Sequence, residues 1–254
     1  MKESLPIFSC ADAVDFCVQA LRTQGCFLWQ NVFATKALRL LKEQLEVKFD
    51  KAEVAYLSGK MHPSVYQERY QYGHLPAELE GDFVSESLKL LAVPALQPLL
   101  KSLFGAEVAI LIKNSLPRRQ SHQWPQRVIP FHQDAEFLGG CPAINFWIPL
   151  NACGQNAPGL ELLREPQQKL WFQIGSDRQT PFVEQRDERI VLAQNRKDAF
   201  WKPEMEPGDL LVFDSYLLHR TSLLPSMWET RYSLEIRLAP MAFAQYLPHL
   251  KLQL

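Results

Sequence analysis

The sequence predicts an α+β fold in which an antiparallel β-sandwich or barrel is flanked by helices, mainly in the N-terminal part. Residues 1–105 carry apolar side chains largely at helical spacing, with one early strand, whereas residues 106–240 form short β-rich runs separated by Pro, Gly and Asn. Helices followed by a series of short strands are typical of this class. Because no repeat, low-complexity tract or linker divides residues 1–254, we expect a single domain.

The first elements are expected to be a helix, a strand and a second helix. Apolar residues recur at helical spacing over residues 9–22, with Ser9 as a cap and Gly25 beyond the end. The run "CFLWQNVF" then predicts a strand. The following stretch, "ATKALRLLKEQLEVKF", places Leu38, Leu41 and Leu45 on one face of a helix.

Residues 50–81 are polar and aromatic without a clear period, which predicts a long loop. Two interpretations are open for it, and the second is slightly favoured: an entrance for a substrate, or a solvated loop anchored by its tyrosines. The candidate lining residues of such an entrance are Tyr66, Arg69, Tyr70, Tyr72 and His74.

The remaining elements are one broken helix and five β-rich runs. The stretch "SESLKLLAVPALQPLLKSLFG" predicts a helix that Pro94 and Pro98 interrupt and that ends at Gly105. The predicted strands lie in "EVAILIKNSL", "AINFWIPL", "GLELLRE", "DLLVFDSYLLH" and "RYSLEIRLAP".

Composition narrows the classes of partner. A net charge of -1, with both signs mixed along the chain, provides no basic field for nucleic acid. No apolar run is long enough to cross a bilayer and the N-terminus lacks a signal peptide, so we expect a cytoplasmic protein without a membrane partner. The five cysteines, Cys10, Cys17, Cys26, Cys141 and Cys153, contain no CxxC pair and fit buried thiols in a reducing compartment.

The segment "FHQD" is the first candidate metal site. Side chains alternate along a strand, so His132 and Asp134 would face the same way and reach one ion. A third ligand is needed, since an HxD pair also arises by chance; the candidate is His219, at the far end of the apolar strand in "PGDLLVFDSYLLHRTS". Two histidines and one carboxylate form the ligand set of non-haem Fe(II) oxygenases.

Arg231 is a candidate partner for the far carboxylate of a dianionic oxo acid bound to such a metal. It lies in "RYSLEIR", with Ser233 on the same strand face, and its guanidinium can bind a carboxylate with two hydrogen bonds. The alternative is a surface ion pair with Glu229 or Glu235, which Arg231 taken alone would favour.

Four motifs in order, "FHQD", "GLEL", "PGDLLVFDSYLLHRTS" and "RYSLEIRL", resemble the phytanoyl-CoA dioxygenase family of Fe(II)/2-oxoglutarate oxygenases. The resemblance extends from about Gly25 to Pro240 and includes "GCFLWQNVFATKALRLL". It is weakest over residues 171–202, and the stretch "NAPGLELLREPQQKLW" lacks the Gly-Ser-His that the family often carries.

The resemblance implies a double-stranded β-helix, or jelly roll, over residues 106–240. It also implies three cofactors or cosubstrates, namely Fe(II), 2-oxoglutarate and O2. By this match His132, Asp134 and His219 bind the iron, and Arg231 binds the distal carboxylate of 2-oxoglutarate. Further cosubstrate contacts implied by the match are Ser233, Thr221, Asn114 and Trp147, although a core aromatic is an equally good interpretation of Trp147.

The expected reaction is hydroxylation of an unactivated C–H bond in a small-molecule or carrier-bound substrate, with release of succinate and CO2. Asp134 disfavours halogenation, in which a small residue replaces the carboxylate. Two other classes remain open, a non-catalytic sensor that binds a metal and an oxo acid, and a cupin-like zinc isomerase or hydrolase. The substrate and the oligomeric state are not predicted. Arg118, Arg119 and Arg127 are candidates for binding a coenzyme A phosphate.

Several other polar residues are assigned no catalysis. His62, His74, His122 and His249 are interpreted as surface or loop histidines. Asp209 and Asp214 are interpreted as turn and strand-edge residues.

Overall fold

The computed structural model describes residues 5–9, 13–75, 83–167, 169–170 and 188–254. The α-helices are α1 (Val14–Gln24), α2 (Thr35–Leu57), α3 (Pro63–Glu68), α5 (Phe83–Leu91), α6 (Gln97–Phe104), α7 (Asp134–Phe137), α8 (Glu188–Gln194) and α9 (Met241–Ala244). Short 3-10 turns are η1 (Tyr70–Tyr72), η2 (Pro94–Leu96), η3 (Pro125–Arg127) and η4 (Lys197–Ala199). The strands are β1 (Ile7–Ser9), β2 (Cys26–Gln30), β3 (Glu107–Leu111), β4 (Leu116–Ser121), β5 (Ile144–Pro149), β6 (Gly159–Leu163), β7 (Phe200–Trp201), β8 (Leu210–Asp214), β9 (His219–Ser222), β10 (Thr230–Ala239) and β11 (His249–Gln253).

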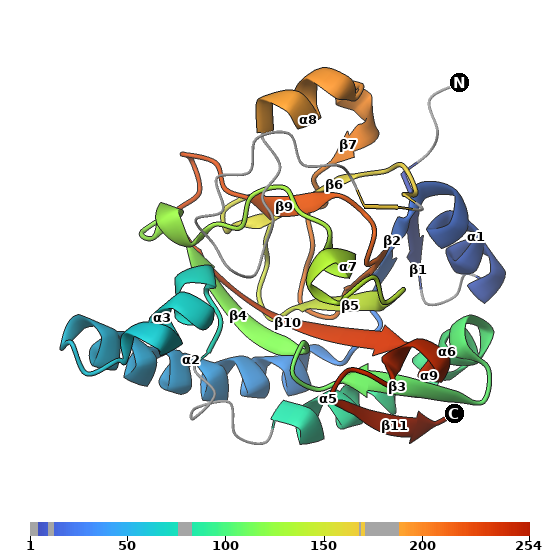
Figure 1. The fold of residues 1–254 in the computed structure, drawn as a ribbon, viewed down its shortest axis with the longest axis horizontal. Coiled ribbons are helices and arrows are strands. Elements are labelled where there is room, and N and C mark those ends of the chain that lie inside the picture. Colours follow the sequence, from blue (N-terminus) through green and yellow to red (C-terminus); the bar gives the residue numbers. More distant parts are fainter. Residues whose placement is uncertain (1–4, 10–12, 76–82, 168, 171–187) are drawn as a thin grey trace.

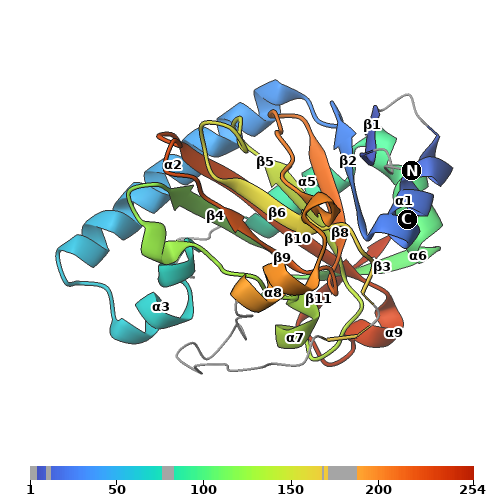
Figure 2. The same cartoon turned by 90° about the horizontal axis from the view of Figure 1, so that it is seen from above.

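The strands form two sheets. The larger has the order β1-β2-β8-β5-β10-β3-β11, with β4 also paired to β10, and the smaller has the order β7-β6-β9. All pairs are antiparallel except β1 with β2. In Figure 1 the strands β4, β5 and β10 lie between α2 on one side and the small sheet on the other, and Figure 2 shows the same layers from above. The predicted fold class, a jelly-roll core with flanking helices, is confirmed.

Alternation along the strands of the large sheet builds two apolar layers. Phe27 and Trp29 of β2 pack with the helices on the outer face, whereas Cys26 and Leu28 pack between the sheets against β6. The side chains of β8 and β5 alternate between the two layers in the same way. In the outer layer they belong to one cluster with Leu38, Leu41 and Leu45 of α2. The predicted apolar face of this helix is therefore the one that contacts the sheet.

Strand β10 crosses the centre of the large sheet and is polar on one face only. Its residues Tyr232, Leu234, Ile236 and Leu238 belong to the outer apolar layer. The alternate residues face the space between the sheets and are all buried: Arg231, Ser233, Glu235 and Arg237. Four consecutive inward positions of this strand are thus available for a polar site.

The first helix begins later than predicted, and a strand that was not predicted precedes it. Residues Ile7–Ser9 form β1, which pairs with β2, so Ser9 is a strand residue and not a helix cap. Helix α1 starts at Val14 after Ala13, which makes no side-chain cap hydrogen bond. At the other end Gly25 adopts a left-handed conformation and its N–H bonds to Leu21 O, as predicted.

The prediction of a long loop over residues 50–81 is wrong for the part that the structure describes, which is largely helical. Helix α2 continues to Leu57, and α3 and η1 follow, while residues 76–81 lie outside the described part of the chain. The apolar period disappears because polar and aromatic contacts replace it. Tyr56 stacks on Tyr66 with ring centroids 5.0 Å apart, and Glu53 binds buried arginines.

Gly73 brings this segment close to β4. Its φ of 77° is in the left-handed region, and a Cβ at this position would collide with the carbonyl oxygen of Arg119. The Arg119 N–H donates to Gly73 O at 2.8 Å, and His74 forms a bridge to Arg118. Glycine is required here because two backbones touch.

The elements after residue 83 agree better with the predictions from the sequence. Pro94 opens η2 and Pro98 lies in the first turn of α6, so both prolines break the helical stretch as predicted. Each of the five predicted runs contains a strand, but β4, β7, β9 and β11 were not expected as separate strands. The run that ends at His219 was predicted as one strand; it forms β8 of the large sheet, which ends at Asp214, and His219 begins β9 of the small sheet. Strand β4 has all six residues buried, two arginines among them, so it shows no alternation of apolar and polar residues.

Within the described residues, none of the helices has the length and apolar content to span a bilayer.

The cysteines in the described part of the chain are buried and form no disulfide, as predicted: Cys17, Cys26, Cys141 and Cys153. Cys10 falls outside the described residues. Burial raises the pKa of Cys26 and of Cys153 to about 12, so both stay protonated.

Candidate metal centre

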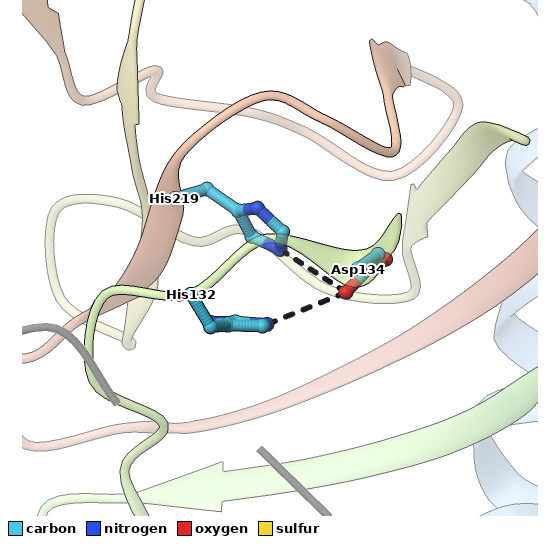
Figure 3. A group of neighbouring side chains, drawn as sticks. All are labelled: His132, Asp134 and His219. Atoms are coloured by element: carbon cyan, nitrogen blue, oxygen red, sulfur yellow. Dashed lines mark ion pairs between the residues drawn. The ribbon is translucent and has the colours of Figure 1, made fainter. Parts of the chain in front are cut away.

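His132, Asp134 and His219 converge between the two sheets (Figure 3). The Oδ1 atom of Asp134 lies 3.4 Å from His132 Nε2 and 3.8 Å from His219 Nε2, and all three side chains are buried. In the part of the chain that the structure describes, they are the one group of three such side chains close enough to hold an ion. The structure therefore brings together the three residues that the sequence singled out.

The backbone that carries these ligands is not the strand that the sequence predicted. His132 forms an isolated bridge with His219: the His132 N–H donates to His219 O at 2.9 Å, and the His219 N–H donates to His132 O at 3.1 Å. Asp134 is already the first residue of α7. Gln133, between them, is extended and its side chain donates to Tyr216 O at 2.7 Å. One extended residue is enough to direct His132 and Asp134 to the same side.

Hydrogen bonds fix both imidazole rings with one nitrogen directed to the centre. His132 Nδ1 lies 2.8 Å from Pro130 O, and His219 Nδ1 lies 2.9 Å from Leu217 O. A carbonyl oxygen can only accept, so each Nδ1 carries the proton and each Nε2 keeps its lone pair. Burial and the nearby His132 lower the pKa of His219 to about 4, which keeps it neutral near pH 7.

Asp134 is held as an anion by Arg237. Burial alone would raise its pKa, but the Arg237 guanidinium and the two histidines outweigh burial and hold the pKa of Asp134 well below its usual value. Arg237 donates to Asp134 Oδ2 from Nε at 2.9 Å and from Nη2 at 2.8 Å. The other oxygen, Oδ1, is buried and has no hydrogen-bond partner among the described residues. That oxygen faces the two imidazoles.

A chain of buried charges extends behind Asp134. Arg237 Nη2 is also 3.0 Å from Glu235 Oε2, and Glu235 forms an ion pair with Arg118 Nε. Burial raises the pKa of Glu235, but Arg118 and Arg237 outweigh it, so the carboxyl stays ionised. The sequence-based prediction assigned no site role to Arg237 and considered Arg118 only as a contact for a coenzyme A phosphate. The alternation of "RYSLEIR" contained a signal for Arg237, because it shares a strand face with Arg231 and Ser233.

Arg231 lies in a small pocket that the metal centre shares. The pocket is lined by both histidines, by Arg231, and by Trp147, whose ring lies 5.2 Å from the guanidinium carbon. Arg231 is 1% exposed and donates to Gly159 O at 3.0 Å. Within the described residues it has no carboxylate partner, so the alternative of a surface ion pair is not found. Burial lowers its pKa to about 10, which leaves it cationic at neutral pH.

The other predicted cosubstrate residues divide into two groups. Thr221 lines the same pocket as Arg231, and Ser233 is fully buried with an unpartnered Oγ on the same face of β10. Trp147 is buried and its Nε1 also has no hydrogen-bond partner in the described chain. Asn114 does not line this pocket but a larger cavity next to it.

The arginines considered for a coenzyme A phosphate are all engaged inside the molecule. Arg119 pairs with Asp50 and Glu53, and Arg127 pairs with Glu53. Arg118 pairs with Glu235, as described above. Since all three side chains are buried and paired with carboxylates, the structure gives no support to their assignment to a coenzyme A phosphate.

The remaining polar residues have structural contacts. Asp209 accepts from the N–H groups of Asn31 and Glu206, and Asp214 accepts from that of Tyr216, in agreement with their assignment to turns. His62 and His122 are exposed, and His249 is half-buried. His74 differs, because it lines the larger cavity.

The donor set at the centre fits a divalent transition metal. Two imidazole nitrogens and one carboxylate oxygen face each other, and Asp134 Oδ1 is buried without a hydrogen-bond partner among the described residues. Imidazole with carboxylate suits Fe(II) and Zn(II), whereas Mg(II) and Ca(II) prefer oxygen ligands alone.

Comparisons with solved structures give the same architecture. AviO1 from Streptomyces viridochromogenes Tue57 is 16% identical with a TM-score of 0.57, and the match covers 93% of this chain and 97% of that one. The epimerase SnoN, in complex with Fe3+, alpha ketoglutarate and nogalamycin RO, is 13% identical with a TM-score of 0.59 over 89% and 83%. The non-heme monooxygenase ThoJ, in its apo form, is 13% identical with a TM-score of 0.54 over 87% and 76%. At these identities the likeness concerns the fold.

Sequence comparison identifies the family. No curated protein matches the chain. Residues 21–223, which include all three centre residues, match the family described as Phytanoyl-CoA dioxygenase (PhyH). The chain therefore belongs to the phytanoyl-CoA dioxygenase family, as the four sequence motifs predicted.

Proposed function

We propose that the protein is an Fe(II)- and 2-oxoglutarate-dependent dioxygenase that hydroxylates an unactivated C–H bond of a small-molecule or carrier-bound substrate. One observation carries the proposal: a buried arginine without a carboxylate partner, Arg231, opens onto the same pocket as His132 and His219. A metal and an anion-binding residue in one pocket suit a cosubstrate that has a metal-chelating end and a distal carboxylate.

In this proposal His132 Nε2, His219 Nε2 and Asp134 Oδ1 hold the iron. The backbone carbonyls of Pro130 and Leu217 fix the two rings, and Arg237 occupies Asp134 Oδ2 so that one oxygen remains for the metal. Asp134 is ionised and His219 is neutral near pH 7, so neither of these two ligands has to lose a proton to bind a metal.

The charge of the pocket matches a dianion. Its buried charged groups are the cations of Arg118, Arg231 and Arg237 and the carboxylates of Glu235 and Asp134, which sum to one positive charge before a metal binds. A divalent metal raises the sum to three. 2-Oxoglutarate would lower it to one, and its distal carboxylate would accept from Arg231. Thr221 and Ser233 could then donate from their hydroxyls.

When bound, iron and 2-oxoglutarate supply the oxidation: O2 is consumed, 2-oxoglutarate is converted to succinate and CO2, and one oxygen atom enters the substrate C–H bond. The protein side chains position these groups and exclude water. Phe213 packs on His219 with ring centroids 4.8 Å apart, and Trp147 and Leu160 add apolar walls. Asp134 as a carboxylate favours hydroxylation over halogenation.

The comparisons support this class of enzyme. Members of the matched family are named for a dioxygenase, and SnoN, which has the same fold, was solved with Fe3+ and alpha ketoglutarate. Two alternatives make different predictions. A sensor would bind the metal and the oxo acid without releasing succinate, and a zinc isomerase or hydrolase would act without O2 or 2-oxoglutarate.

The test is an anaerobic titration of metal-free protein with Fe(II) and 2-oxoglutarate, followed by the visible charge-transfer band of the chelate. The band should form in the wild type and in His62→Ala, an exposed histidine, and should be absent in His132→Ala. Folded, iron-loaded wild type without a band would overturn the proposal. A band without succinate release under O2, for any substrate screened, would favour the sensor.

Arg231→Lys tests the cosubstrate site separately from the metal. Iron binding should be retained, and the apparent Kd for 2-oxoglutarate should rise by about 100-fold, because lysine cannot reproduce a two-point contact. The matched control is Arg39→Gln, since the Arg39 side chain is 69% exposed. An unchanged Kd in Arg231→Lys would show that the distal carboxylate binds elsewhere.

A further inference from the structure

A second, larger cavity adjoins the metal centre. It has a volume of about 300 Å³ and shares His132, Arg118, Ile129 and Arg237 with the pocket of Arg231. A molecule in it would contact the ring of one proposed metal ligand without occupying the cosubstrate pocket. The position fits the substrate that is oxidised, and the volume is at the small end of ligand sites.

Two segments far apart in the sequence form the outer wall of this cavity. One is residues 68–74, which Gly73 holds against β4, and the other is the turn of residues 112–115 between β3 and β4. Figure 1 shows α3, which precedes the first segment, beside β4. Arg69, Tyr72 and His74, three of the candidate lining residues of a substrate entrance, all line the cavity.

The inner wall is apolar. Leu116, Ile129 and Phe137 line it, and Leu116 and Ile129 are buried. An apolar surface next to His132 would hold the hydrocarbon part of a substrate at the metal and leave hydrogen bonding to the outer wall.

The charged residues of the lining are mainly basic. Arg69, Lys113, Arg118 and Arg237 stand against one carboxylate, Glu68, although the whole chain has a net charge of -1. Arg118 and Arg237 are already paired with Glu235 and Asp134. The charge that remains available to a substrate is therefore on the outer wall.

Lys113 and Asn114 are adjacent on this wall, where Nε2 of His74 also has no hydrogen-bond partner among the described residues. Lys113 is exposed and Asn114 half-exposed, and neither side chain has a hydrogen bond or ion pair with any described residue. The backbone carbonyl of Asn114 accepts from Arg237, so the turn is fixed at the edge of the centre. An ammonium and a carboxamide on adjacent residues can together donate to a carboxylate.

We propose that the substrate is a carboxylic acid with an apolar body, whose carboxylate binds Lys113 and Asn114 and whose hydrocarbon part lies along Leu116, Ile129 and Phe137 toward His132. This inference rests on the proposed function, since it assigns the cavity to the oxidised substrate. It also reassigns Asn114 from the cosubstrate to the substrate.

The test uses three probes of equal length with different head groups: octanoate, octanamide and octylamine. Each is titrated into anaerobic protein loaded with Fe(II) and 2-oxoglutarate, and binding beside the iron is detected as a shift of the chelate band. Octanoate should bind at least about tenfold more tightly than octanamide, and octylamine most weakly. Lys113→Glu should weaken octanoate about tenfold or more and remove this preference, because it reverses the charge at the head group.

Asn114→Leu should weaken octanoate binding less than Lys113→Glu does, since the leucine variant removes only a neutral donor. The control is Lys101→Glu, the same charge change on α6 at an exposed position, which should leave octanoate binding unchanged. Equal binding of octanoate and octanamide, no band shift with octanoate, or wild-type affinity in Lys113→Glu would overturn this inference. The chelate band without any probe would survive each of these results, so the proposed function is tested apart from it.

Discussion

Arg237 connects the proposed metal ligand Asp134 to the rest of the barrel. Its Nε and Nη2 both donate to Asp134 Oδ2, and the same Nη2 contacts Glu235. Without this guanidinium, Asp134 would be a buried carboxylate that can rotate, and burial would favour its protonated form. The orientation of Asp134 thus depends on Arg237, and its ionisation depends on Arg237 together with the two histidines.

Arg237→Gln should lower the affinity for the metal by about 10- to 100-fold, the usual effect of removing a partner of a metal ligand. Co(II) serves as the probe, because it suits the same donors, is stable in air and absorbs visible light. The Co(II) affinity of Arg237→Lys should lie between those of Arg237→Gln and the wild type, since lysine keeps the charge but not the two-point contact. The matched control is Arg39→Gln, and equal Co(II) affinity of Arg237→Gln and this control would contradict the prediction.

Sequence alone identified His132, Asp134, His219 and Arg231, because motif spacing and residue type carry that information. It did not identify the contacts of Arg118, since these depend on register. Arg118 lies opposite Ser233 in the β4–β10 pair, next to Glu235, and no pattern within "LPRRQS" specifies that pairing. Sequence also could not show that Asn114 lines the larger cavity, because a turn between strands does not reveal which side it faces.

At the scale of elements, Glu53 in the last turns of α2 contacts both β4 and η3, whereas Asp50 of the same helix contacts β4 alone. Glu53 accepts from Arg119 at 2.9 Å and from Arg127 at 3.2 Å, and the hydroxyl of Tyr70 also donates to it. Arg119 and Arg127 are buried, whereas the Glu53 side chain is 14% exposed. This contact fixes the segment from which the cavity wall begins.

Glu53→Gln should lower the free energy of unfolding by about 3 kcal/mol, because two buried guanidinium groups lose their shared anion. Urea denaturation gives this free energy. The control is Glu43→Gln on the same helix, whose ion pair with Arg39 joins side chains that are 60% and 69% exposed. That pair should contribute no more than about 0.5 kcal/mol. Equal losses in the two variants would show that Glu53 is only a surface residue.

The same region explains where prediction of elements failed. Strong apolar periods identified α1, the start of α2 and most strands of the large sheet. The end of α2 lacks such a period because it packs through Glu53 and Tyr56, and β4 lacks alternation because both of its faces are buried. In both cases contacts with distant segments, and not local pattern, stabilise the element.

At the scale of the whole molecule, the proposed metal would link two segments that are far apart in the sequence and belong to different sheets. His132 and Asp134 precede β5 of the large sheet, whereas His219 begins β9 of the small sheet. The backbone bridge between His132 and His219 already joins these segments. A metal bound to all three side chains would add a connection that the unfolded chain cannot make in the same way.

Metal should therefore stabilise the folded protein. At a free Co(II) concentration of 100 times Kd, binding to the folded state alone contributes about 2.7 kcal/mol, which corresponds to a rise in Tm of about 5 to 10 °C for a chain of this size. Thermal unfolding with and without Co(II) measures it. The rise should vanish in His132→Ala and persist in His62→Ala, in which an exposed histidine is removed. An equal rise in His132→Ala would mean that the metal binds elsewhere, and no rise in the wild type would mean that the three side chains do not hold it.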